Sequence, residues 1–202
     1  MSEAPLRSLT LESFLDALAA KSPTPGGGSA AGLVGATSAA LAGMVVAYSL
    51  GKKDLAAHQG VLQDAAERLA RARRLMLDLA DEDAAAYGAV NELSRLPPDN
   101  PRRADLPAAR LASVQVPLVM LATCADLLRL MESLSPITNR HLRSDLAIAA
   151  TLAQGAAHSA FCNIRINAEE LSAEDRRRSF DEGVLLAANC KRRAALVEKA
   201  CA

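Results

Sequence analysis

The run Pro25-Gly26-Gly27-Gly28-Ser29 is the segment whose residue types point most clearly to ligand binding. It leads directly into an uncharged stretch that predicts a helix, with Ser29 as a natural cap. Backbone N–H groups at a helix start can hold an anion or a polar ring edge. The run is either a plain helix entry or a loop that faces a ligand, and three consecutive glycines lose more chain entropy than one turn requires. It has neither the Gly-Lys-Ser/Thr ending of a phosphate-binding loop nor the spacing of a dinucleotide fingerprint.

Charged side chains that could contact a ligand occur in two further places. Lys52 and Lys53 end the uncharged stretch. There they either complement a helix dipole or meet a carboxylate or a polarised nitrogen. Asp83 lies in the acidic run 81–83 and shares a helix face with Tyr87, four residues later. This run is either a solvated face or, at Asp83, the edge of the core.

Polar pairs also lie on a helix predicted near the C-terminal end. Asp145 follows Ser144 at the start of that helix, where an acidic residue also suits the helix dipole. Asn163 and Asn167 are four residues apart on the same helix. Neither pair identifies a site by itself. The four cysteines and three histidines have no metal-binding spacing, so we expect no metal site.

The elements that must position these residues are predicted to be helices, because apolar residues recur at helical spacing and no alternating β-branched run competes. The expected helices span Thr10 to Ala20, Ala30 to Leu50, Asp54 to Ser94 with a break near Gly60, Ala108 to Ser133 with a kink at Pro117, Ser144 to Glu170, and Ser172 to Ala200. The hydroxyl of Thr10 is expected to cap the first of these helices, and a capping box starting at Ser172 is expected to open the last. The prediction is therefore an all-α fold, a bundle of about six mostly antiparallel helices. Residues 1–202 are expected to form a single domain.

The composition argues against nucleic-acid binding. The chain of 202 residues balances 23 Lys+Arg against 23 Asp+Glu, and it contains two Tyr, three Phe and no Trp. It therefore has neither a positive field that would gather phosphates nor an aromatic platform on which bases could stack. We expect no nucleic-acid partner.

One uncharged stretch, Ala30 to Leu50, is long enough to cross a bilayer. Its many Ala, Gly, Ser and Thr residues insert less readily than Leu or Phe, so a buried helix in a bundle is the preferred interpretation over a membrane span. Small residues at Gly28, Gly32 and Ala36 would let another backbone approach closely. The first ten residues show no secretory signal, and we expect a cytoplasmic protein without membrane contact.

Taken in order, these segments resemble one family, the cyclodeaminase/methenyltetrahydrofolate cyclohydrolase family. It includes the C-terminal domain of formiminotransferase-cyclodeaminase and stand-alone serine-cycle cyclohydrolases. The Pro-Gly-Gly-Gly-Ser run followed by Gly-Lys-Lys is the specific part of the resemblance. The matching segments are Leu11–Leu15, Pro23–Ser29, Gly51–Lys53, Asp83–Tyr87, Val116–Leu118, Arg143–Leu146 and Asn163–Asn167.

The resemblance implies an all-helical homodimer that binds a tetrahydrofolate derivative in a cleft containing the glycine run. It also implies a reaction at a one-carbon unit that bridges two folate nitrogens, with no metal and no redox cofactor. Asp83 is then the first choice for the carboxylate that stabilises the cationic carbon and takes a proton from attacking water. Lys52 would orient water or a leaving nitrogen, and Asp145 is the second carboxylate candidate.

Substrate-binding roles follow from the same resemblance. The residues Pro25, Gly26, Gly27, Gly28 and Ser29 would line the cleft. Ser144, Asn163 and Asn167 would hydrogen-bond the pterin or water. Lys53, together with Arg140 and Arg143, would meet the glutamate tail of folate.

Two activities and one non-catalytic role are compatible with this reading. The first is hydrolysis of 5,10-methenyltetrahydrofolate to 10-formyltetrahydrofolate. The second is deamination of formiminotetrahydrofolate, and the segment Arg143-Ser144-Asp145-Leu146 resembles the deaminase domain more closely. We expect no formiminotransferase domain to deliver a formimino folate to these residues, and this context favours the cyclohydrolase. The third is a non-catalytic helical dimer or folate-binding protein.

Overall fold

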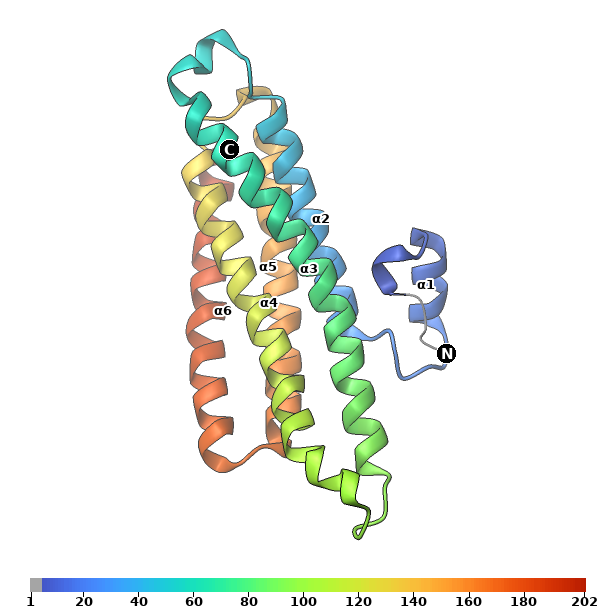
Figure 1. Ribbon diagram of the computed structural model, residues 1–202. Coiled ribbons are helices and arrows are strands. Elements are labelled where there is room, and N and C mark those ends of the chain that lie inside the picture. The colour runs from blue at the N-terminus through green and yellow to red at the C-terminus, as the bar shows by residue number, and fades with distance from the viewer. Residues whose placement is uncertain (1–4) are drawn as a thin grey trace.

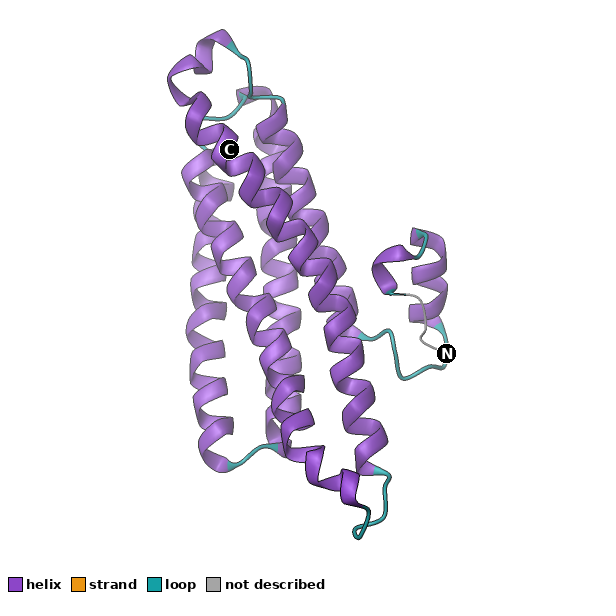
Figure 2. Cartoon of the chain, viewed as in Figure 1, coloured by secondary structure: helices purple, strands orange, loops and turns teal. Residues whose placement is uncertain are grey.

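Six α-helices form the described part of the chain. The computed structural model describes residues 5–202, and Figure 2 shows helices and loops with no strand in that part. The helices are α1 (Leu11–Ala19), α2 (Gly27–Ala47), α3 (Gln59–Ser94), α4 (Leu106–Leu134), α5 (Arg143–Asn167) and α6 (Ala173–Cys201). The predicted all-α bundle of six helices is confirmed. The N-terminal residues 1–4, part of the segment in which we saw no secretory signal, lie outside the described residues.

The five long helices α2 to α6 run side by side in alternating directions (Figure 1). The short helix α1 lies outside these five, on the side of α2 and α3. The long helices pack in the neighbouring pairs α2–α3, α2–α5, α4–α5, α3–α4, α5–α6 and α4–α6. Short connections make successive helices antiparallel. As a result, the starts of α4 and α6 and the end of α5 share one end of the bundle, whereas the end of α2 and the start of α5 share the other.

Glycines on α2 let this helix approach α3 more closely than a Cβ would allow. A Cβ added at Gly32 would lie 2.7 Å from the Ala80 Cβ and 2.7 Å from the Met76 backbone oxygen. A Cβ at Gly35 would overlap the Met76 methyl group. The close backbone approach expected from the small residues of this helix is therefore confirmed, and its partner is α3.

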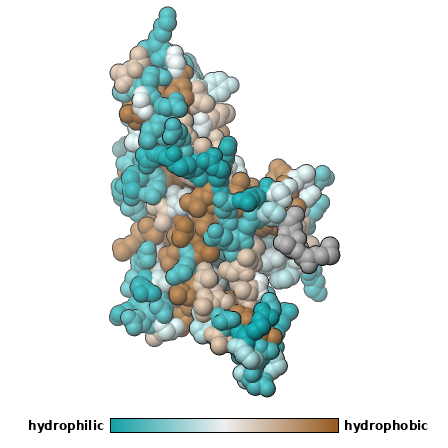
Figure 3. Space-filling model, in the orientation of Figure 1, coloured by the Kyte–Doolittle hydropathy of each residue, from teal (hydrophilic) through white to brown (hydrophobic). Residues whose placement is uncertain are grey.

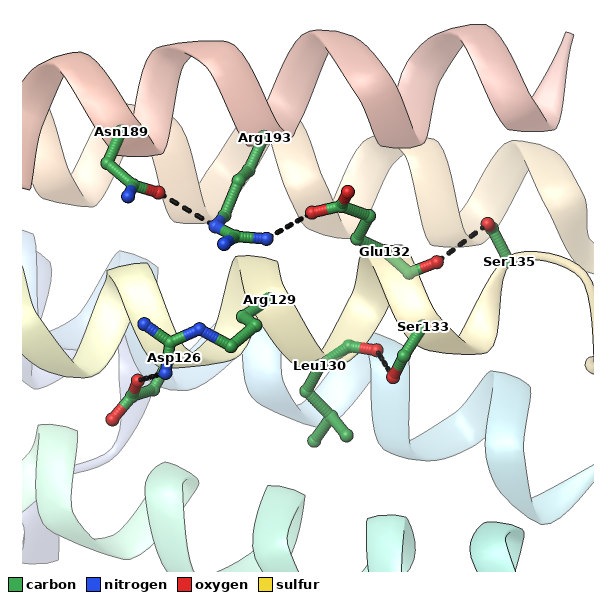
Figure 4. A network of polar contacts seen from close by, with 8 residues as sticks. All are labelled: Asp126, Arg129, Leu130, Glu132, Ser133, Ser135, Asn189 and Arg193. Carbon is green, nitrogen blue, oxygen red and sulfur yellow. Dashed lines mark hydrogen bonds and ion pairs between the residues drawn. The ribbon is translucent and has the colours of Figure 1, made fainter.

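Helix α6 is tied to α4 by a polar network. The Arg193 Nε donates to the Asn189 Oδ1 at 2.7 Å, and the same guanidinium pairs with the Glu132 carboxylate on α4 (Figure 4). The Arg193 side chain is only 18% exposed. Because little water competes for this ion pair, it contributes more than a surface pair would.

Several helix ends differ from the expectations. Ser29 does not cap α2: the helix starts at Gly27, with Gly26 as the N-cap, and the buried Ser29 hydroxyl donates to the Ala80 oxygen instead. Glycine is accepted in this first turn because α3 packs against it. The break expected near Gly60 occurs earlier, in a 3-10 turn at Lys53–His58 with non-helical backbone at Leu55.

The fourth helix contains the expected internal proline, and hydroxyl groups cap two other helices at their starts. Helix α4 continues through the buried Pro117. The Ser13 N–H donates to the Thr10 hydroxyl and the Asp175 N–H donates to the Ser172 hydroxyl, each at 3.1 Å. These caps fix the starts of α1 and α6 where the sequence predicts them.

Two helical segments are long and apolar enough to cross a membrane, judged by length and composition alone. They are Gly27–Ala47 and Pro101–Leu134, and half of the apolar window of each is buried inside the bundle. The core helix of a soluble protein passes the same test. Figure 3 shows apolar side chains gathered over the middle of the visible face, with hydrophilic groups above and below them.

Candidate active site

The carboxylate of Asp83 lies directly against the start of α2. A Cβ added at Gly28 would overlap the Asp83 carboxyl carbon and both of its oxygens. Only a glycine therefore leaves room for this carboxylate. The hydroxyl of Ser29 donates to the Ala80 oxygen at 3.3 Å and holds the first turn of α2 against the turn of α3 that precedes Asp83.

Burial sets the electrostatics of this carboxylate. Asp83 is half-buried, and desolvation raises its pKa from 3.8 to about 6. Burial disfavours the charged form, which moves the group into the range where an acid exchanges protons near neutral pH. Asp83 is thus ionised at pH 7 and basic enough to accept a proton during a reaction.

The other acidic groups of this stretch of α3 are used differently. The Leu6 N–H donates to the Asp81 Oδ1 at 2.6 Å, and Arg7 pairs with Asp78. These contacts attach the N-terminal turn to α3. The Asp83 carboxylate makes no hydrogen bond or ion pair with residues 5–202. Asp83 therefore lies at the edge of the core, and its oxygens remain available to a ligand.

A cavity of about 280 Å³ opens where α2 begins, and Asp83 lies in its wall. The wall combines the glycine run, α3, α4 and α5. A Cβ added at Gly27 would lie 3.6 Å from the Asn163 Oδ1, so the Asn163 amide faces the glycine run. The lining residues are Pro23, Thr24, Gly26, Gly27, Gly28, Asp83, Tyr87, Ser113, Asn163, Ile166 and Asn167.

The two asparagines of α5 have different roles in this wall. The Asn167 Nδ2 donates to the backbone oxygen of Ser113 at 2.8 Å, which links α5 to α4. The side-chain oxygen of Asn167 is left for a ligand. The Asn163 side chain makes no hydrogen bond within residues 5–202, so its amide offers both a donor and an acceptor. One carboxylate, one free amide and helix-start backbone groups therefore converge on one small cavity.

The predicted residues are only partly brought together. Gly26, Gly27, Gly28, Asp83, Asn163 and Asn167 line the cavity, whereas Pro25 and Ser29 are buried beside it. The sequence interpretation did not include Ser113 or Ile166 in the site, and no motif marks them. Tyr87 had a signal, because it follows Asp83 by one helical turn.

The remaining predicted residues lie at the opposite end of the bundle. Lys52 and Lys53 follow α2, whose 21 residues separate its ends by about 30 Å. Asp145, next to Ser144, is in the first turn of α5, about 27 Å from Asn163 by helical rise. The Asn139 N–H donates to the Ser49 hydroxyl at 2.8 Å, which joins the loop before α5 to the end of α2. Within one chain these four residues do not reach Asp83.

The cations expected to meet a glutamate tail share that distant end. Arg140 lies in the 3-10 turn Arg140–Leu142, and Arg143 is the first residue of α5. Lys53 begins the 3-10 turn after α2. A tail extending from a ring beside Asp83 would have to cross most of the bundle to reach them. In the part of the chain from residue 5 onwards, no group of three His, Cys, Asp or Glu side chains is arranged to hold a metal ion.

Comparisons with known proteins agree with this fold. A family model described as formiminotransferase-cyclodeaminase matches residues 10–184. The methenyltetrahydrofolate cyclohydrolase of Methylorubrum extorquens is 33% identical over 185 residues, covering 87% of this chain and 88% of that protein. The formimidoyltransferase-cyclodeaminase of Mus musculus is 30% identical over 175 residues, covering 84% of this chain and 32% of that longer protein.

A solved structure has the same architecture. The crystal structure of formiminotetrahydrofolate cyclodeaminase from Thermotoga maritima superposes with a TM-score of 0.91 at 28% identity. The match covers 97% of each chain.

Proposed function

Since the chain belongs to the formiminotransferase-cyclodeaminase C-terminal domain family, whose named relatives modify folates, we propose that it hydrolyses 5,10-methenyltetrahydrofolate to 10-formyltetrahydrofolate. The observation that carries the proposal is the Asp83 carboxylate, with a pKa of about 6, in the wall of a small cavity beside Gly28 and Asn163. Further support comes from a relative named as a cyclohydrolase, because this chain matches it over 88% of its length.

The reaction requires one group that can stabilise a cation and carry a proton. In the substrate, a positively charged carbon bridges N5 and N10 of the folate. The Asp83 carboxylate stabilises this charge and takes one proton from the water whose oxygen bonds to the carbon. The bond from carbon to N5 then breaks, Asp83 returns its proton to N5, and the new hydroxyl loses its proton to solvent as the formyl group forms on N10.

The polar groups around Asp83 suit the pterin ring. Backbone N–H groups of the glycine run can meet ring oxygen or nitrogen, and the Asn163 amide matches a ring edge that has both donors and acceptors. The reaction changes no oxidation state, so it needs no redox cofactor. We propose that the protein acts in the cytoplasm.

A second candidate is formiminotetrahydrofolate cyclodeaminase, because the structural neighbour with a TM-score of 0.91 has that name. In this reaction N10 attacks the formimino carbon and ammonia leaves. Asp83 would take the proton from N10 and give it to the leaving nitrogen. The same cavity and the same carboxylate would therefore serve either reaction.

Two assays with the purified protein separate these candidates. The first follows the loss of methenyltetrahydrofolate absorbance, corrected for uncatalysed hydrolysis. The second measures ammonia released from 5-formiminotetrahydrofolate. The proposal predicts fast turnover in the first assay and none in the second. The opposite result would establish the cyclodeaminase, and no turnover in either would leave a non-catalytic folate-binding or structural role.

We further propose that residues 1–202 act as one domain and that two copies pair along the groove between α2 and α3. Helix α2 carries no charged residue, yet Ala40, Met44 and Ala47 are exposed along this groove. The groove has a volume of about 360 Å³. Uncharged helix surface of this kind is stabilised when a second copy covers it.

A pair of this kind accounts for the two separated groups of predicted residues. Ala40 lies about midway between Gly27 and Lys52 along the chain. A two-fold axis beside Ala40 would turn the partner's α2 antiparallel, so that the Lys52 end of one copy meets the Asp83 end of the other. Lys52 would then orient water or the leaving nitrogen, and Asp145 would be the second carboxylate, each acting from the opposite copy.

A further inference from the structure

A second and larger cavity lies between the end of α5 and the start of α6. Its volume is about 730 Å³, and three arginines line it, Arg165, Arg176 and Arg177. Glu169 is the acidic residue in the same wall. Positive charge therefore exceeds negative charge in this cavity, although the whole chain has no net formal charge.

The three arginines have no acidic partner within the described chain. None of their nitrogens lies within 4.0 Å of a carboxylate oxygen belonging to residues 5–202. Neighbouring arginines are paired: Arg178 with Asp175 at 2.8 Å, and Arg110 with Glu170 at 2.6 Å. The guanidinium groups in the cavity wall are therefore available for a carboxylate from outside.

This arginine-lined cavity adjoins the cavity that contains Asp83. Ile166 lines both cavities and is 67% exposed. The Asp83 cavity, at about 280 Å³, is at the small end of ligand sites, which hold drug-sized molecules in about 300–1,000 Å³. A folate whose ring fills it must extend outward, and the path over Ile166 leads to the arginines.

The lining of the second cavity suits the part of folate that remains outside the first. Phe180 is 42% exposed and offers an aromatic face, and its ring lies 6.0 Å from that of Phe161. The p-aminobenzoyl ring can pack on such a face. Each glutamate of the tail brings carboxylates that an arginine fork binds with two parallel hydrogen bonds.

We propose that the cavity lined by Arg165, Arg176 and Arg177 binds the p-aminobenzoyl-glutamate part of the substrate and selects folates with several glutamates. This inference rests on the proposed function, because the ring must occupy the Asp83 cavity. It replaces Lys53, Arg140 and Arg143 as the partners of the tail within one chain.

Steady-state kinetics with mono- and triglutamate forms of 5,10-methenyltetrahydrofolate test the proposal. Exposed ion pairs contribute about threefold each in affinity, so removing two should cost about tenfold. The double variant R176Q/R177Q should raise the KM for the triglutamate about tenfold and lose the preference over the monoglutamate, with the effect on KM rather than kcat. R178Q is the matched control, since Arg178 is already paired with Asp175, and it should behave as wild type.

A binding measurement separates failure of this inference from failure of the proposed function. Calorimetry with p-aminobenzoyl triglutamate uses a probe that has no pterin and no one-carbon unit, so it does not depend on turnover. Wild type and R178Q should bind it, and R176Q/R177Q should bind about tenfold more weakly. Equal affinity in all three proteins, or an unchanged triglutamate KM in an active double variant, would overturn the inference. Binding without turnover in wild type would instead overturn the proposed function alone.

Discussion

Replacing Gly28 with alanine tests the position of the reactive carboxylate. A Cβ at residue 28 would overlap the Asp83 carboxyl group, so the carboxylate must move by about 1 Å or more to reach normal contact. A displacement of this size at a catalytic group costs about 100-fold in rate. We expect Gly28→Ala to fold and to lose about that factor in kcat.

The stability change has two opposing parts. Overpacking at Gly28 costs about 1–3 kcal/mol, whereas alanine in place of glycine in a helix gains about 1 kcal/mol. Gly155→Ala on α5 is the matched control, because this helical glycine has nothing within 4 Å of an added Cβ. It should gain about 1 kcal/mol and keep full activity. The difference between the two variants therefore isolates the overlap with Asp83.

A double-mutant cycle attributes the cost to the carboxylate itself. Asp83→Ala removes the atoms that overlap, so Gly28→Ala should destabilise the Asp83→Ala protein much less than it destabilises wild type. The coupling should be about 1–3 kcal/mol in urea unfolding. A fully active Gly28→Ala protein, or a cycle without coupling, would refute the placement of Asp83 against α2.

Three further predictions concern charge, packing and assembly. Because burial raises the pKa of Asp83 to about 6, kcat/KM should rise with pH up to about 6 and then level. The free energy of unfolding of Asp83→Asn, relative to that of wild type, should increase from pH 4 to pH 6 and stay at the higher value above pH 6. The sign follows because the folded carboxyl binds its proton more tightly than the unfolded one; a stability difference independent of pH would contradict it. Arg193→Met should lower the free energy of unfolding by about 2 kcal/mol in urea, because it leaves Glu132 without its partner, and should leave kcat unchanged. Equal amounts of the Asp83→Asn and Lys52→Met proteins, unfolded and refolded together, should recover about a quarter of wild-type activity if each site is shared between two copies. About half of the dimers are then mixed, and each mixed dimer has one intact site of two. No recovery would count against sharing.

The helices could be predicted from the sequence because helical spacing, proline and glycine breaks and hydroxyl caps are local features. Thr10 and Ser172 cap α1 and α6 as predicted. Ser29 failed as a cap for a tertiary reason: the contact with α3 makes glycine acceptable inside the first turn of α2, and the hydroxyl is used for the Ala80 oxygen. Local rules cannot anticipate such a contact.

The site could be predicted from the sequence only in part. The glycine run and Asp83 were singled out separately, but their contact depends on how α2 and α3 are aligned, which no local pattern encodes. The distance between Lys52 and Asp83 follows from helical rise along α3, because Lys52 precedes this helix and Asp83 lies well inside it. The predicted helices therefore already implied that these residues lie far apart in one chain. The arginines near the start of α6 carried no motif, and their role depends on which of them find carboxylate partners.

The most direct test of the central claim is the rate of 5,10-methenyltetrahydrofolate hydrolysis by wild type and by Asp83→Asn under the same conditions. Thermal unfolding of both proteins verifies that the variant is folded. Asparagine keeps the shape of the side chain and removes its capacity to accept a proton. The account predicts fast hydrolysis by wild type and a rate near the uncatalysed one for the folded variant. Equal hydrolysis by the two proteins would contradict it.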